Sequence, residues 1–127
     1  MMRRILIVDD ERHLRLLYRR ELEDDGYQVV EAANAEEGIR AFEQQRPDLI
    51  VMDIRMPGMN GLEAMARILD KDRRVPIVLN TAFDSYRDDF TSWAADAYVT
   101  KGPDTEELRR TVRKLLEERE HLGPGEL

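Results

Sequence analysis

The sequence predicts an α/β fold in which helices cover both faces of a five-stranded parallel sheet. Short apolar runs rich in Val and Ile alternate along the chain with segments of helical periodicity, a pattern typical of parallel strands buried on both faces. The chain of 127 residues is long enough for one domain with a single sizeable core. Right-handed crossovers between successive strands then place the helices in two outer layers.

The expected strands are the five apolar runs, and the second and fifth are the least apolar, as edge strands can be. These runs are Ile5–Val8, Gln28–Ala32, Leu49–Met52, Ile77–Leu79 and Ala97–Val99. Each is followed by a helical segment, so the predicted architecture is a doubly wound (βα)5 domain. This is a flavodoxin-like three-layer sandwich.

The first helix is expected from Leu14, Leu17, Tyr18 and Leu22, which recur at helical spacing before a glycine cap at Gly26. The next two carry apolar stripes, and the fourth is short and polar. The second helix is expected from Ala35, Ile39 and Phe42 and ends at Pro47. The third is expected from Leu62, Met65, Ile68 and Leu69, and the fourth from the segment around Ser85 to Trp93.

The last helix has Asp104 as its expected N-cap and Leu108, Val112, Leu115 and Leu116 on one stripe. The sequence Gly123-Pro124-Gly125 is expected to end this helix. We therefore expect one domain over residues 1–121 and a flexible C-terminal tail over residues 122–127.

Composition excludes several classes of function. The net charge of −7 argues against direct nucleic-acid binding, which needs clustered cations. The absence of cysteine excludes disulfides and zinc–thiolate sites. The apolar run at Ile5–Val8 is too short for a signal peptide or a membrane span. These features predict a cytoplasmic protein that does not bind membranes.

Polar groups follow four of the five strands, where ligands bind in such folds. They are Asp9 and Asp10, Asp53, Asn80-Thr81-Ala82, and Thr100-Lys101. Three carboxylates in one pocket repel each other unless a cation is present. Mg²⁺ prefers oxygen ligands and commonly bridges carboxylates to phosphate, and a lysine can contact a phosphoryl oxygen. A carboxylate can itself accept a phosphoryl group.

The runs that carry these groups resemble bacterial two-component response-regulator receiver domains, including the single-domain chemotaxis receivers. The matching runs are Ile-Leu-Ile-Val-Asp9-Asp10-Glu, the stretch from Asp48 to Gly61, Pro76 to Ala82, and Ala97 to Lys101. The resemblance covers about residues 4–120.

The resemblance implies that Asp53 is the phosphoacceptor. It implies that Asp10, Asp53 and the backbone carbonyl of Arg55 bind Mg²⁺, with Mn²⁺ as a substitute, and that Asp9 acts through water. The phosphoryl group would be contacted by the Thr81 hydroxyl, the Ala82 backbone and Lys101. Thr81 and Tyr98 would form the conformational switch.

Two features vary within the family or depart from it. Lys101 is followed by Gly102 and not directly by proline, so we expect a trans bond there, a loop shaped by glycine's freedom, and a Lys101 that still reaches the site. Arg55 and Phe83 occupy positions that tune dephosphorylation in the family. Their bulk predicts an acyl phosphate that survives for minutes or more.

The expected function is a signalling switch without enzymatic activity beyond Mg²⁺-dependent self-phosphorylation and autodephosphorylation. A sensor histidine kinase or phosphotransfer protein would donate the phosphoryl group. The fourth helix, fifth strand and last helix would signal to a downstream target protein, from a monomer or a phosphorylation-linked dimer.

Rival functions are weaker. A haloacid-dehalogenase-type phosphatase needs an aspartate where Arg55 stands, and Asp9-Asp10-Glu11 would repel the phosphate of a flavin. An interaction module of the receiver fold that works without phosphorylation stays open.

Overall fold

Five parallel strands form one sheet in the order β2-β1-β3-β4-β5. The structure is a computed structural model and describes residues 2–82, 87, 89–102 and 104–122. The strands are β1 (Arg4–Val8), β2 (Gln28–Ala32), β3 (Leu49–Met52), β4 (Ile77–Thr81) and β5 (Ala97–Thr100). The prediction of five parallel strands is confirmed, and β2 and β3 have the predicted bounds.

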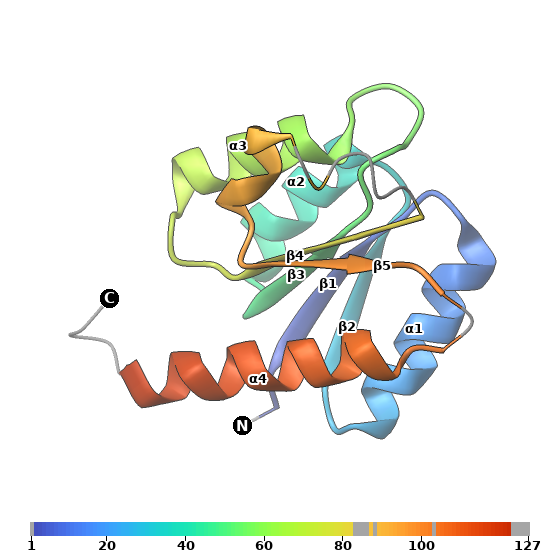
Figure 1. Ribbon diagram of the computed structural model, residues 1–127, viewed down its shortest axis with the longest axis vertical. Helices are drawn as coiled ribbons and strands as arrows, with labels where there is room; N and C mark the ends of the chain where they lie inside the picture. Colours follow the sequence, from blue (N-terminus) through green and yellow to red (C-terminus); the bar gives the residue numbers. More distant parts are fainter. Residues whose placement is uncertain (1, 83–86, 88, 103, 123–127) are drawn as a thin grey trace.

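The described residues include four α-helices in two layers. They are α1 (Arg12–Asp24), α2 (Ala35–Gln45), α3 (Gly61–Lys71) and α4 (Glu106–Leu122). Figure 1 shows α1 and α4 on one face of the sheet and α2 and α3 on the other. The predicted three-layer sandwich is therefore confirmed. Within the described part of the chain, no helix is both long and apolar enough to cross a membrane.

The sheet separates two buried layers. One lies between the sheet and α2 and α3, and it includes Phe42, Leu62 and Met65. The other lies between the sheet and α1 and α4, and it includes Leu22 and Val112. The strand order reverses between β1 and β3, so the ends of these two strands frame the crevice where such folds bind ligands.

The fourth helix differs from its prediction. Residues 83–86 and 88, in the predicted span around Ser85 to Trp93, lie outside the described residues. Phe90–Ala94 forms a short 3₁₀ helix, η2, which lies against α3 (Figure 1). The segment lacks the apolar periodicity that lets a longer helix bury one face.

The helix ends follow the predictions with one shift. Gly26 has a φ of 97° and follows the C-cap of α1, Asp25, in the left-handed position that glycine favours. The Asp104 carboxylate accepts the Glu106 N–H at 2.9 Å, but α4 begins at Glu106, so Asp104 lies one residue before the expected cap position. The tail was expected over residues 122–127, but Leu122 is the last residue of α4, and residues 123–127 lie outside the described residues.

Gly61 starts α3 against the backbone of the loop that follows β3. Its N–H donates to the Ile54 carbonyl at 2.8 Å. A Cβ atom at this position would lie 2.0 Å from the carbonyl oxygen of Asp53. Only glycine therefore lets α3 approach this loop so closely.

We predict that Gly61→Ala lowers the free energy of unfolding by about 2 kcal/mol or more, because the new methyl group must push backbone apart. Gly102→Ala is the matched control: a Cβ there meets no atom within 4 Å, so its effect should stay within about 0.5 kcal/mol. Urea unfolding of both variants checks this. A Gly61→Ala variant as stable as Gly102→Ala would contradict the packing described.

Candidate functional site

Three carboxylates meet at the ends of β1 and β3. One oxygen each from Asp9, Asp10 and Asp53 lies within 4.8 Å of the others. Asp9 and Asp53 are 2% and 5% exposed, while Asp10 is exposed at the rim. The predicted convergence of these groups is confirmed. Clustered hard oxygen donors of this kind fit Mg²⁺.

A lysine ammonium lies between the two buried carboxylates. Lys101 Nζ donates to Asp9 Oδ2 at 2.8 Å and to Asp53 Oδ2 at 3.1 Å. The lysine side chain is itself only 10% exposed. Its backbone N–H donates to the Thr81 carbonyl at 2.7 Å, which ties the base of the side chain to the end of β4.

The alternation of side chains along the strands brings these groups to one face of the sheet. Asp9, Asp53 and Lys101 each come two residues after a side chain buried against α1 and α4. Residues two apart on a strand point the same way. The short apolar strands therefore aim all three side chains into one pocket at their carboxyl ends.

The loop after β1 is held by its own polar contacts. Asp9 Oδ1 accepts the Glu11 N–H at 2.9 Å. The Arg15 guanidinium donates to the Asp9 carbonyl at 2.7 Å and to Glu31 Oε1 at 3.3 Å. Arg15 therefore fixes the backbone of Asp9 while its own charge is balanced by Glu31. The sequence pattern did not predict this role for Arg15.

Burial and, to a smaller extent, the charge of Asp9 raise the pKa of Asp53 to about 6, against the attraction of Lys101. Burial alone would lower the pKa of Lys101. Its hydrogen bond to Asp9 and the charges of Asp53 and Asp9 outweigh burial and raise that pKa above its usual value. The pocket thus holds one firmly protonated lysine among carboxylates that repel each other.

The other predicted site residues lie at the end of β4 and in the loop after β3. Thr81 is fully buried as the last residue of β4, and Ala82 after it is exposed. Arg55 is exposed in the loop after Asp53. The predicted contacts of these groups with a metal or a phosphoryl group stay predictions. Phe83, the second predicted tuning residue, lies outside the described residues.

Tyr98, the predicted switch aromatic, lies half-buried on β5. The Arg87 guanidinium stands 4.6 Å from the centroid of its ring, and Arg87 Nη2 also donates to Thr100 Oγ1 at 3.0 Å. Arg87 therefore covers the ring by a cation–π contact. Movement of Tyr98 stays a prediction.

The expectation about Gly102 is confirmed in one part and wrong in another. No cis peptide bond is present among the described residues, and Lys101 reaches Asp9 and Asp53 as predicted. Glycine's freedom does not shape the loop, because the φ of Gly102 lies outside the left-handed region. The side chain has length enough to reach the site from an ordinary backbone.

A buried polar pair beside the site has no assigned role in the sequence analysis. The pair consists of Tyr18 on α1 and Asn80 on β4. They are 4% and 3% exposed. The signal in the sequence is an asparagine inside the apolar run Ile77-Val78-Leu79.

Comparison with known proteins assigns the family. The profile of the response regulator receiver domain matches residues 5–113. Sporulation initiation phosphotransferase F of Bacillus subtilis is 31% identical over 91% of this chain and 95% of its own. The alkaline phosphatase synthesis transcriptional regulatory protein PhoP of the same organism is 33% identical over 98% of this chain and 53% of its own. The chain therefore belongs to the response-regulator receiver family of two-component systems.

Solved structures agree with this assignment. The response regulator TrrA of Thermotoga maritima, solved with Mg²⁺ and BeF, is 45% identical with a TM-score of 0.87, over 90% of this chain and 99% of its own. TrrA in complex with the histidine kinase ThkA gives a TM-score of 0.85, over 91% and 99% of the two chains. The chain spans about half the length of several transcriptional regulators that it matches.

We predict that Asp53→Asn raises the free energy of unfolding at pH 8 without Mg²⁺ by roughly 2 kcal/mol. The pKa of Asp53 is about 6 in the folded protein, above its ordinary value of 3.8. Its neutral form therefore favours folding at low pH, and this benefit is lost as the pH rises through 6. Near pH 4 the variant and the parent should differ little.

Urea unfolding at both pH values measures this, and Mg²⁺ supplies a control. The parent should gain more stability from Mg²⁺ than Asp53→Asn does, because the ion replaces repulsion with attraction at an ionised Asp53. An Asp53→Asn variant that is less stable at pH 8 than the parent would contradict the conclusion that the ionised Asp53 carboxylate destabilises the folded protein.

Proposed function

We propose that the chain is a phosphorylation switch in which Asp53 accepts a phosphoryl group from a phosphohistidine with the help of Mg²⁺. The observation that carries this proposal is the buried Asp53 carboxylate, which shares one ammonium with Asp9 beside the exposed Asp10. A sensor histidine kinase or phosphotransfer protein would be the donor. The complex of TrrA with ThkA supports a kinase partner.

In this mechanism a carboxylate oxygen of Asp53 attacks phosphorus, the acyl phosphate bond forms, and the bond from phosphorus to the donor imidazole breaks. Asp10, Asp53 and the Arg55 carbonyl would hold Mg²⁺ (or Mn²⁺), with Asp9 acting through water. The ion would neutralise charge on the phosphoryl oxygens. TrrA solved with Mg²⁺ and BeF supports this ion at such a site.

Lys101 is placed to follow the phosphoryl group. Its Nζ already lies 3.1 Å from the Asp53 oxygen that would carry phosphorus or stand next to it. Phosphorylation adds roughly two negative charges and three strong acceptors at that point. Lys101 then turns from the carboxylates to a phosphoryl oxygen, together with the Thr81 hydroxyl and the Ala82 N–H.

The donor must dock next to the mouth of this pocket, and α1 offers apolar surface there. Leu16 and Leu17 are 50% and 41% exposed. They lie in the first two turns of α1, which begins after the acidic loop at Asp9 to Glu11. Exposed leucines of this kind suit a helical face of the partner.

Output would pass from the site through Thr81 and Tyr98 to the segment between β4 and β5, β5 and α4. Thr81 ends β4, and its register partner Thr100 lies two residues beyond Tyr98 on β5. Movement of Thr81 toward the phosphoryl group would free space for the Tyr98 ring. It would thereby shift the equilibrium between two conformations of this surface. Trp93, 71% exposed on η2, lies in the same surface and can meet a downstream target protein.

This proposal places the protein in the cytoplasm, as a monomer or a dimer linked to phosphorylation. Its only enzymatic activities would be self-phosphorylation from a small phosphodonor and autodephosphorylation. The second candidate is a receiver-fold module that binds its partner without phosphorylation. The Asp9–Lys101–Asp53 contact favours the switch, because an interaction module has no need of buried repelling carboxylates.

We predict that acetyl phosphate labels the protein only with Mg²⁺ and that Asp53→Ala abolishes the labelling. Intact mass and peptide mapping measure the added group and its position. Asp96→Ala is the control. The Asp96 carboxylate accepts a hydrogen bond from the Ile77 N–H at the opposite end of β4, so this substitution should leave labelling intact. A Mg²⁺-dependent label on another residue, or none on a folded protein, would favour the module without phosphorylation.

We predict that the acyl phosphate survives for minutes or more in Mg²⁺. The long exposed side chain of Arg55 stands two residues from Asp53 and should hinder an attacking water. Phe83 is expected to add to this. Decay of the labelled protein measures the lifetime, and Arg55→Ala should shorten it several-fold. A parent half-life of seconds would contradict this prediction.

A further inference from the structure

The backbone carbonyl of Asp9 finds its partner outside the sheet. The register of β1 with β2 ends where Val8 is paired with Ala32. The N–H of Asp9 still donates to the Ala32 carbonyl at 3.1 Å. Its own carbonyl, which leads to Asp10, instead accepts from Arg15 Nη1 on α1 at 2.7 Å. A side chain therefore takes the place of a strand at the point where the chain enters the acidic loop.

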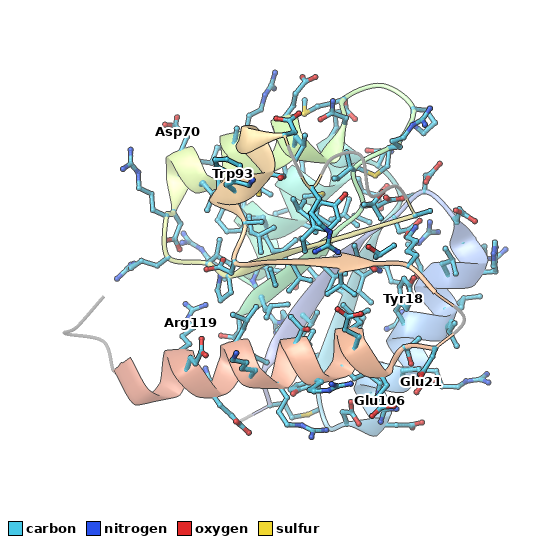
Figure 2. All side chains as sticks on the ribbon, viewed as in Figure 1. Tyr18, Glu21, Asp70, Trp93, Glu106 and Arg119 are labelled. Atoms are coloured by element: carbon cyan, nitrogen blue, oxygen red, sulfur yellow. The ribbon has the colours of Figure 1, made fainter. Side chains whose placement is uncertain are left out.

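Arg15 is itself held in place. Its side chain is 14% exposed, and its Nε donates to Glu31 Oε1 on β2 at 3.3 Å. Tyr18, one turn further along α1, is buried beside the sheet (Figure 2), so this side of the helix carries Arg15 toward the sheet. The guanidinium is planar, and its donors keep fixed angles to one another. With Glu31 on one donor, another is aimed at the Asp9 carbonyl.

The bond to this carbonyl matters because a peptide unit is planar. The Asp9 carbonyl and the Asp10 N–H belong to one plane, so a fixed carbonyl also fixes the direction in which the chain reaches Asp10. The Asp9 side chain is held by the Glu11 N–H at 2.9 Å and by Lys101 at 2.8 Å. Arg15 adds the contact that holds the peptide between Asp9 and Asp10 itself.

Asp10 depends on this peptide more than the other two carboxylates do. Asp9 and Asp53 are buried and share one ammonium, whereas Asp10 is exposed at the rim. Within the described part of the chain, no hydrogen bond or ion pair holds the Asp10 carboxylate. One of its oxygens still lies within 4.8 Å of an oxygen of each of the others. The place of Asp10 in the cluster is therefore set by its backbone.

A purely structural role for Arg15 is already filled by Arg19. One helical turn further on, Arg19 Nη1 donates to Glu31 Oε2 at 2.5 Å, so it balances the same carboxylate and joins α1 to β2. Its other hydrogen bonds go to Glu23 and to the Val29 carbonyl, and none within the described residues goes to the acidic loop. What Arg15 adds to these contacts is the bond to the Asp9 carbonyl.

We propose that Arg15 is a positioning residue for Mg²⁺ binding: its hydrogen bond to the Asp9 carbonyl holds the following peptide so that the Asp10 carboxylate is already in place for the ion. The inference rests on the proposed function, in which Asp10 and Asp53 hold Mg²⁺. A ligand that is already in place binds an ion without first being ordered, so the affinity is higher. Groups that orient the ligands of a metal typically contribute about 10- to 100-fold to its affinity.

The test compares Arg15→Met, which keeps an apolar stem but no donor, with the matched control Arg19→Met. Both variants lose one cation bound to Glu31, and only the first loses the bond to Asp9. Mg²⁺ is titrated into the unmodified proteins, and the backbone amide shifts give its dissociation constant. Arg15→Met should raise this constant about tenfold. Arg19→Met should leave it within about twofold of the parental value.

Labelling with acetyl phosphate separates Mg²⁺ binding from the chemical step. In Arg15→Met the Mg²⁺ concentration for half-maximal rate should rise by the same factor as the dissociation constant. The rate at saturating Mg²⁺ should stay within about twofold, because Asp53 and Lys101 are unchanged. The inference is overturned if Arg15→Met loses stability but binds Mg²⁺ as the parent does. It is also overturned if both variants weaken Mg²⁺ binding equally.

Relaxation of the Asp10 backbone ¹⁵N nucleus without Mg²⁺ gives a reading independent of both measurements. Asp10 should be more mobile in Arg15→Met than in the parent or in Arg19→Met, and equal order in all three overturns the inference. A parent that binds no Mg²⁺ overturns it as well. If the parent binds Mg²⁺ but is not labelled on Asp53, the proposed function fails, and the dissociation constants still decide whether Arg15 positions Asp10.

Discussion

The contact of Lys101 Nζ with Asp9 and Asp53 is the interaction on which the site depends. Two carboxylates that are 2% and 5% exposed repel each other in a medium that screens charge poorly. The lysine offsets part of this repulsion, and the pKa of Asp53 still rises to about 6. The repulsion between the carboxylates is therefore only partly offset. A divalent cation would reduce it, and a phosphoryl group on Asp53 would offer Lys101 a new partner.

The fold makes this arrangement by simple means. Parallel strands end at the same edge of the sheet, and the order reverses between β1 and β3, which opens a crevice there. Gly61 lets α3 begin against the Asp53 carbonyl, and Arg15 holds the Asp9 carbonyl from the side of α1. The backbone of Asp53 is thus held by α3, and the backbone of Asp9 is held by α1.

Much of this could be predicted from the sequence because the strands are short, apolar and regularly spaced. The alternation rule then places polar residues such as Asp9, Asp53 and Lys101 at one edge. The segment after β4 could not be predicted as well, since it lacks periodicity and its last residues, Phe90–Ala94, form a 3₁₀ helix. The ordinary backbone of Gly102 was also not predicted. A glycine permits unusual backbone angles, but the sequence does not show whether the fold requires them.

The buried side chains of Tyr18 and Asn80 show another limit of sequence reasoning. Asn80 is visible as a polar residue in an apolar strand, but its position beside Asp53 follows only from the register of β3 with β4. The burial of Tyr18 likewise follows only from the packing of α1 against the sheet. Local patterns predict which face a residue occupies, while pairing across elements needs the assembled fold.

A crystal structure of the protein with Mg²⁺ and beryllofluoride would show whether Lys101 follows a phosphoryl group on Asp53. We expect beryllofluoride on Asp53, Mg²⁺ held by Asp10 and Asp53, and Lys101 Nζ moved from the carboxylates to a fluorine. Lys101 pointing away from Asp53 in that complex, or beryllofluoride bound elsewhere, would contradict this expectation.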